Sequence, residues 1–307
     1  MIALVTGSTG FCGKRLVRAL RAQDVTVVRV SQRAAGPDVE RVDLTDPVAI
    51  GQVLERSRPD VAFHLHGVMS APDVTTFVRE NTLPAAALLD AAEHLKLRDT
   101  TFLFTGTAAE YGNVGAGDLP VRESTRAAPV TPYGISKWAQ TELALEAARR
   151  GRRIVVARPS NILGAGMPSY FALASFARQL AEIERGQRPP VLDTGNLESV
   201  RDFIDVDDVI HAYLALVRMP DAVGQVVNVS SGTGVRLSDA LARLIQAFGV
   251  RVEIRRAASR LHAADLSSFY ASREKLDALV GARSLLPLDE SLRRLVEHAR
   301  LSPYGDS

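Results

Sequence analysis

The sequence is poor in cysteine: Cys12 is the only one among 307 residues. A single thiol cannot close an internal disulfide or complete a structural zinc site. His64 and His66 stand two residues apart without a third ligand, so they do not indicate a metal centre either. We therefore expect no metal and, because disulfides are excluded, a cytoplasmic location.

Long apolar runs and an excess of one charge are also missing. No stretch reaches the roughly 18 apolar residues that a membrane-spanning helix needs. The 37 Lys and Arg are scattered and balanced by 35 Asp and Glu, which leaves a formal net charge of +2. Partners such as nucleic acid or a membrane surface are therefore not expected. The start MIALVTGSTGF lacks a basic segment and runs into glycine, so it is expected to be a strand rather than a signal peptide.

What the sequence does contain is a regular alternation of short β-branched runs and amphipathic stretches. Strands are expected over 2–7, 25–30, 61–67, 101–106 and 153–159, and helices over 12–23, 46–57, 81–95 and 133–149. Nearly continuous apolar strands between helices predict an α/β fold with a parallel sheet covered on both faces, the Rossmann-type doubly wound arrangement.

The pattern loosens after Asn161. Helices are expected over about 169–185, 202–217, 237–248 and near 289–300, a strand over 226–231 and an Arg-rich segment over 251–260. These segments predict a smaller C-terminal α/β substrate lobe at the open edge of the sheet, where α/β proteins bind ligands. The Rossmann domain would comprise 1–161 with about 201–235, and the lobe about 162–200 with 236–307.

The first strand leads directly into a loop with the spacing GxxGxxG. Glycines let the backbone turn tightly and let a pyrophosphate approach the N-terminus of the next helix, where free N–H groups favour an anion. Because the loop lies at a strand–helix junction, it predicts dinucleotide binding. The expected contacts are Gly7, Thr9, Gly10, Phe11, Cys12 and Gly13.

The second strand indicates which dinucleotide is bound. An acid at its end would bind the ribose hydroxyls of NAD, whereas a base would accept the 2′-phosphate of NADP. The sequence there ends in Ser31, Gln32 and Arg33 and has no acid. Arg33, helped by Ser31, therefore favours NADP(H) and still allows NAD(H). The alternative is a solvated surface arginine.

Tyr133 precedes Lys137 by one helical turn. Such a pair is common on helix surfaces, but it also suits proton transfer. Hydride addition to a ketone needs a proton for the oxygen, and a free tyrosine has a pKa near ~10. A nearby ammonium and a positive nicotinamide ring lower that pKa.

Six segments together resemble the extended short-chain dehydrogenase/reductases that act on nucleotide sugars. They are TGSTGFCG (6–13), HLHG (64–67), TGTAAEYG (105–112), PYGISK (132–137), RPSN (158–161) and RDFIDVDD (201–208). They occur in order over residues 1–240. Within this family, residues 158–209 are most similar to GDP-4-keto-6-deoxymannose reductases and GDP-mannose 4,6-dehydratases.

The resemblance implies a catalytic set of Thr107, Tyr133 and Lys137. Tyr133 would donate the proton, Thr107 would hydrogen-bond the substrate carbonyl, and Lys137 would hold the nicotinamide ribose and lower the tyrosine pKa. Further cofactor contacts are implied for Asp43, Leu44, Leu65, His66, Gly67 and Pro159. Substrate contacts are implied for Thr107, Ala108, Tyr133, Asn161, Arg201 and Arg260.

Two of these substrate contacts concern phosphate. Arg201 would pair with the diphosphate, unless it forms a salt bridge to Asp202 or another nearby acid. Arg260 would be a second phosphate ligand, because the Arg-Pro-x-Glu-like clamp of the family is not intact here. The guanosine assignment therefore rests on the resemblance alone.

The residues after Thr107 restrict the reaction. Related 4,6-dehydratases carry an acid two positions later, and enzymes of the GDP-fucose synthase type carry a cysteine there. This chain has Ala109, preceded by Ala108, and neither can move a proton. Glu110 comes one residue late, and strand alternation would turn it to the other side. We therefore predict NADPH-dependent reduction of the C4 ketone of a nucleotide-linked 4-keto-6-deoxyhexose, GDP-linked by resemblance.

Two alternatives stay open. One is a nucleotide-sugar 4-epimerase with tightly bound NAD. The other is a non-catalytic NADP-sensing regulatory protein, which is disfavoured because Tyr133 and Lys137 are both present. Family members usually pair through the helices near 81–95 and 133–149, so the resemblance also implies a homodimer with a four-helix interface.

Overall fold

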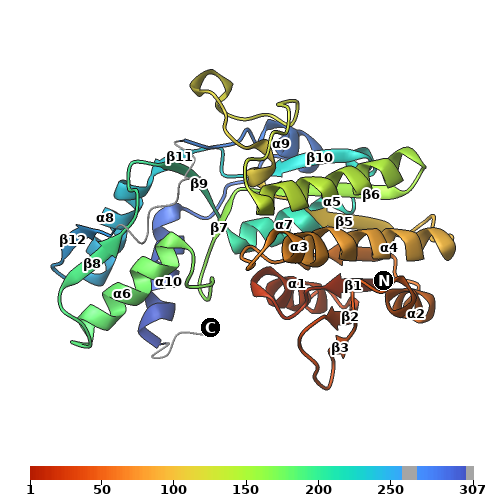
Figure 1. Cartoon of the computed structure of the whole chain (residues 1–307), viewed down its shortest axis with the longest axis horizontal. Helices are drawn as coiled ribbons and strands as arrows, with labels where there is room; N and C mark the ends of the chain where they lie inside the picture. Colours follow the sequence, from red (N-terminus) through yellow and green to blue (C-terminus); the bar gives the residue numbers. More distant parts are fainter. Residues whose placement is uncertain (258–267, 302–307) are drawn as a thin grey trace.

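A sheet of seven parallel strands forms the centre of the larger part of the molecule (Figure 1). The computed structural model describes residues 1–257 and 268–301. The strands, in the order in which they pair, are β10 (Gln225–Val229), β6 (Arg153–Pro159), β5 (Thr101–Thr105), β4 (Val61–His64), β1 (Ile2–Thr6), β2 (Thr26–Ser31) and β3 (Glu40–Arg41). The order reverses direction at β1. A ligand crevice is expected at this reversal, outside the carboxyl ends of the strands.

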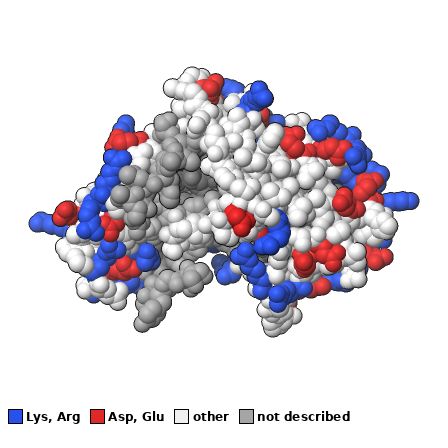
Figure 2. Space-filling model, viewed as in Figure 1, with Lys and Arg blue, Asp and Glu red and all other residues white. Residues whose placement is uncertain are grey.

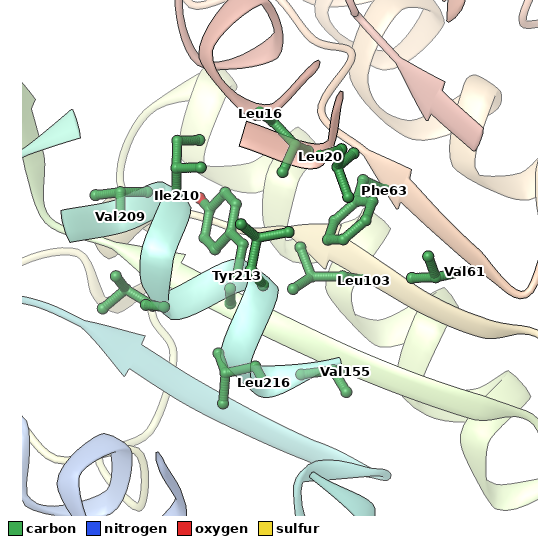
Figure 3. Close-up of a cluster of buried hydrophobic side chains, with 14 of the residues drawn as sticks. Leu16, Leu20, Val61, Phe63, Leu103, Val155, Val209, Ile210, Tyr213 and Leu216 are labelled. Atoms are coloured by element: carbon green, nitrogen blue, oxygen red, sulfur yellow. The ribbon is translucent and has the colours of Figure 1, made fainter. Parts of the chain in front are cut away.

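Helices cover both faces of this sheet. One face packs against α1 (Phe11–Arg21), α7 (Val206–Leu216) and α9 (Glu274–Val280), and the other against α2 (Pro47–Ser57), α4 (Leu83–His94) and α5 (Pro132–Arg149). On the first face, Leu16 and Leu20 meet Phe63 and Tyr213 in one apolar cluster (Figure 3). The central strands are apolar throughout because both of their faces are buried.

A second group of elements has its own apolar core. Its helices are α6 (Ala172–Glu184), α8 (Leu237–Phe248) and α10 (Leu288–Leu301). A two-stranded sheet pairs β8 (Val191–Thr194) with β12 (Glu253–Arg256), and a three-stranded sheet contains β11 (Gly234–Arg236), β9 (Val200–Asp205) and β7 (Asn161–Leu163). In Figure 1 this group lies to one side of the large sheet.

The expectation of one helix over 202–217 is wrong in its first part. Residues up to Asp205 form β9, which lies between β7 and β11, and α7 starts only at Val206. The Asp205 carboxylate accepts a hydrogen bond from the backbone N–H of Asp207 at 2.8 Å and so caps the helix. The Arg-rich segment likewise contains a strand, β12, that the sequence did not predict.

Short helical elements connect the longer ones. They are α3 (Val74–Phe77), the π-helical turn η1 (Val78–Thr82) and the 3₁₀ turns η2 (Ala108–Tyr111), η3 (Ala116–Asp118) and η4 (Pro220–Ala222). Across the described part of the chain, no helix has the length and apolar character needed to cross a membrane. Lys and Arg alternate with Asp and Glu over the face seen in Figure 2.

Candidate active site

The glycine loop leaves no room for side chains at two positions. Gly7 has a φ of +66°, and a Cβ there would lie 2.8 Å from the backbone nitrogen of His66. A Cβ on Gly13 would lie 2.1 Å from the Gly7 carbonyl oxygen. Gly10 is the N-cap of α1 and supplies no capping side chain, and the first turn has no acid. The loop therefore fits an anionic pyrophosphate at the start of α1.

Cys12 lies in the first turn of α1. Burial raises the pKa of its thiol to about 12, so the thiol is neutral at physiological pH. It packs against the core under the sheet face that α1 covers. A neutral thiol is a poor nucleophile, which favours the packing role over a reactive one.

The end of β2 provides polar groups next to the loop. The hydroxyls of Ser31 and Thr9 lie 3.2 Å apart. Arg33 is 71% exposed, and its guanidinium is 3.6 Å from a carboxylate oxygen of Glu80. Glu80 belongs to η1, and its side chain is only 7% exposed. The sequence did not connect these two residues.

Two of the expected cofactor contacts, Asp43 and Leu44, follow β3. Asp43 is exposed, and its carboxylate accepts hydrogen bonds from the backbone N–H of Thr45 at 2.9 Å and from its hydroxyl at 2.7 Å. Leu44 is buried in the apolar cluster on the α2 side of the sheet. Asp43 is therefore the member of this pair that is accessible to a polar ligand.

Residues 65–67 connect the glycine loop with the catalytic helix. His66 packs against Gly7, and its Nε2 lies 3.7 Å from the Glu80 carboxylate. Burial lowers the pKa of His66 to about 4, so the ring is neutral. A Cβ on Gly67 would lie 3.8 Å from the Lys137 ammonium nitrogen. The predicted contacts Leu65, His66 and Gly67 thus run between the loop and Lys137.

Local capping positions two of the catalytic candidates. Thr107 follows β5 directly and is the N-cap of η2. Tyr133 lies in the first turn of α5, where the Thr131 hydroxyl accepts a hydrogen bond from the Gly134 N–H at 3.1 Å and Pro132 occupies the first turn. The Thr107 side chain interacts with the Tyr133 phenol and lowers its pKa. Lys137, one turn later, donates to Gln140 Oε1 at 2.7 Å.

Burial dominates the proton affinities of this set. It raises the pKa of Tyr133 to about 12, against a smaller lowering by the interaction with the Thr107 side chain. It lowers the pKa of Lys137 to about 8, and the nearby charge of Glu110 opposes this. In the protein alone, burial outweighs any lowering of the tyrosine pKa by Lys137. Tyr133 is a neutral proton donor at pH 7.

Glu110 departs from the expected geometry. Residues 108–111 form the 3₁₀ turn η2, not an extended strand, so the alternation argument does not apply. Glu110 is fully buried, and its carboxylate accepts a hydrogen bond from the Thr107 N–H at 2.8 Å. Ala108 and Ala109 occupy the two positions after Thr107, and neither carries a group that can move a proton.

A cavity of about 430 Å³ lies between β7, β9 and α6. Asn161 and Arg201, two of the predicted substrate contacts, line it. The cavity is also lined by residues that were not predicted from the sequence, among them Tyr170, Phe171, Arg178, Asn196 and Phe203. Tyr170 and Phe171 are consecutive aromatic residues, and their ring centroids lie 4.6 Å apart in the structure. This aromatic pair is the sequence feature that could have predicted part of the cavity wall.

Asn161 and Arg201 are held by nearby backbone. Asn161 donates to the Asp202 carbonyl oxygen at 3.0 Å, and Arg201 donates to the Val200 carbonyl oxygen at 2.9 Å. The Asp202 carboxylate accepts from the backbone N–H and hydroxyl of Ser231 at 2.9 and 2.7 Å. Pro159 ends β6 and is buried. Arg260 lies outside the described residues.

The chain is similar to proteins of one known family. Residues 3–230 match the sequence profile described as the NAD dependent epimerase/dehydratase family. The chain belongs to this family. GDP-6-deoxy-D-mannose reductase of Pseudomonas aeruginosa is 33% identical over 299 residues, which cover 95% of each chain. A dTDP-6-deoxy-L-talose 4-dehydrogenase (NAD(P)(+)) of Kitasatospora kifunensis is 31% identical over 288 residues, 92% of this chain and 88% of its own.

A solved structure agrees with this assignment. The structure of RMD from Pseudomonas aeruginosa, complexed with NADPH, has a TM-score of 0.88 at 30% identity and covers 98% of this chain and 99% of its own. The Rossmann-type α/β fold class and the family expected from the sequence are therefore confirmed.

Proposed function

We propose that this protein uses NADPH, with NADH as a weaker substitute, to reduce the C4 ketone of a nucleotide-diphospho-4-keto-6-deoxyhexose. The observation that carries the proposal is the Thr107 side chain interacting with the Tyr133 phenol, with Lys137 one helical turn after Tyr133 and alanines at the two positions after Thr107. This set can exchange a proton with one oxygen. It has no second acid or thiol that could remove a proton from a carbon atom, as dehydration, or epimerisation by that route, requires.

Each of these residues has one role in the proposed reaction. Bound NADPH supplies the hydride to C4. The Tyr133 phenol donates its proton to the C4 oxygen, so that the ketone becomes a hydroxyl, and Thr107 orients that oxygen by a hydrogen bond. Lys137 would hold the nicotinamide ribose, and its positive charge together with that of the oxidised ring would stabilise the phenolate that Tyr133 becomes when it gives up its proton.

The glycine loop and Arg33 support NADPH as the cofactor, because they fit a pyrophosphate and a 2′-phosphate. The cavity beside Arg201 and Asn161 supports a nucleotide diphosphate, since Arg201 can pair with phosphate. A GDP-linked sugar is proposed from the reductase relative, although the talose dehydrogenase relative is named for a dTDP-linked sugar. The Rossmann domain would hold the cofactor and the C-terminal lobe the nucleotide.

The test is a Tyr133→Phe variant. With NADPH and GDP-, dTDP-, UDP- and CDP-linked 4-keto-6-deoxy sugars, the wild-type protein should consume NADPH with at least one sugar. Loss of the general acid should reduce kcat by about 10²- to 10⁴-fold. NADPH affinity, measured by fluorescence, should change little, and Tyr270→Phe should retain activity. Unchanged turnover in Tyr133→Phe would contradict this mechanism. Copurified NAD without net NADPH use would favour the 4-epimerase.

We also propose a cytoplasmic homodimer that pairs through α5 and the helical segment near 81–95. These elements pack side by side, and they expose Leu83 (45%), Ile135 (49%) and Trp138 (37%). Together with Leu143, the α5 residues follow the i, i+3, i+8 spacing of one apolar face. Clustered exposed apolar side chains favour a contact with a second copy.

A further inference from the structure

The buried carboxylate of Glu110 lies directly behind the catalytic candidates. One of its oxygens accepts hydrogen bonds from the Thr107 backbone N–H at 2.8 Å and from the Thr141 hydroxyl at 3.1 Å. The other accepts from Arg158 Nε at 2.7 Å. Its side chain is 0% exposed. The carboxylate therefore joins the end of β5, helix α5 and strand β6.

The surrounding chain is built to hold this group. A Cβ on Gly106 would lie 2.5 Å from Glu110 Oε1, so a larger residue at that position would displace the carboxylate. Arg158 is also buried, and its guanidinium lies 4.8 Å from the centre of the Tyr111 ring. A buried ion pair is weak evidence for added stability, because desolvating two charges offsets their attraction. A role in positioning explains the pair better.

Glu110 also compensates the charge of a buried lysine. Lys137 is 4% exposed, and Glu110 is the acid that favours its ammonium form. The other titratable groups around it are His64, the last residue of β4, and His66, two residues after that strand, while Arg158 on β6 pairs with Glu110. Burial lowers the pKa of both histidines, so they are neutral near pH 7. Glu110 is thus the negative charge that faces Lys137.

We propose that Glu110 is a positioning residue, which fixes Thr107 through its backbone N–H and keeps Lys137 in its ammonium form. The inference rests on the proposed reductase function. Glu110 does not touch the substrate; it acts through the two residues that do the chemistry. Related dehydratases carry their acid one position earlier, where this chain has Ala109. Glu110 therefore has a different role from that acid.

The test is Glu110→Gln, which retains the acceptor for the Thr107 N–H and removes the negative charge. Without that charge the neutral form of Lys137 is favoured, so its pKa falls below about 8. The high-pH limb of kcat/KM should therefore move to lower pH. A shift of about one pH unit would make activity roughly tenfold lower than wild type above pH 8, while activity at pH 6 stays within about threefold.

The matched control is Glu93→Gln. Glu93 also accepts hydrogen bonds from a buried arginine, Arg152, at 2.6 and 2.8 Å, but this pair joins α4 to the residue just before β6, far from η2. Glu93→Gln should lower the free energy of unfolding without shifting the high-pH limb of kcat/KM. A folded Glu110→Gln variant with lower activity at every pH and an unmoved limb would overturn the proposal.

A second variant and a second readout keep the test decisive. If Glu110→Gln fails to fold because Arg158 is left unpaired, the double variant Glu110→Gln with Arg158→Gln removes both charges and should show the same direction of shift. NADPH affinity against pH, measured by fluorescence, reports Lys137 without turnover. A shifted affinity profile with no reductase activity would reject the reaction and retain the role of Glu110; an unshifted profile would reject that role.

Discussion

Arg33 interacts with more than solvent. Its guanidinium lies beside the buried Glu80, which also faces the neutral His66. A 2′-phosphate brings a charge of about −1.5 to −2, by analogy with other phosphate monoesters. Arg33 would attract that charge, whereas Glu80 would oppose it. We therefore expect the balance between these two residues to set the preference between NADPH and NADH.

Removing Glu80's charge should therefore sharpen the preference for NADPH. We expect Glu80→Gln to raise the ratio of kcat/KM for NADPH over NADH by about three- to tenfold, and Arg33→Gln to lower it by about tenfold or more. Steady-state kinetics with both cofactors measure the ratio. Arg79→Gln is measured alongside, because the Arg79 Nε also lies 3.4 Å from the Glu80 carboxylate and its contribution must be separated from that of Arg33. An unchanged ratio in Glu80→Gln would remove Glu80 from this account.

At the scale of an element, the turn from β1 into α1 depends on close backbone approach. The Gly13 Cα faces the Gly7 carbonyl oxygen so closely that any side chain must displace the loop. The same turn fits the pyrophosphate. Loop shape and cofactor affinity are therefore coupled in one short segment.

Gly13→Ala should lower NADPH affinity by more than about tenfold and also lower the free energy of unfolding, because the new methyl group pushes on backbone. Gly51→Ala is the matched control within α2. A Cβ there meets only the Ala91 methyl group, at 3.7 Å, and alanine favours a helix interior by roughly 0.5–1 kcal/mol. Fluorescence titration and chemical denaturation distinguish the two. Normal NADPH binding by Gly13→Ala would show that the loop tolerates the shift.

At the scale of the whole molecule, the exposed apolar side chains of α4 and α5 lie on the outside of the sheet's α2 face. Ile135 is close in sequence to Tyr133, so a contact with a second copy would also steady the start of the catalytic helix. Assembly and activity would then be linked through α5.

Ile135→Glu combined with Leu83→Glu should convert the dimer to a monomer, since two charges would be desolvated at the interface. Light scattering after size-exclusion chromatography measures the mass. Val48→Glu is the control, because Val48 is 66% exposed and belongs to α2, which is not one of the two helical segments of the proposed interface. A monomeric wild-type protein at micromolar concentration would contradict the proposed dimer.

Features set by neighbouring residues were predictable. The glycine loop, the alternation of strands and helices and the start of α5 depend on local spacing, capping and side-chain shape. The family and the parallel α/β fold followed from them. The start of α7 was not predictable in this way: the segment up to Asp205 becomes a strand because β7 and β11 pair with it from distant parts of the chain.

The amino-acid sequence by itself determined the cofactor loop, the Thr107, Tyr133 and Lys137 set, and the alanines that narrow the reaction. Only the tertiary structure decided which charges surround them. Glu110 meets Arg158 and Thr141, and Glu80 meets Arg33, across different elements. Burial shifts the proton affinities of Tyr133 and Lys137. Electrostatic energy depends on distance and desolvation in space, and neither quantity is encoded in the local sequence pattern.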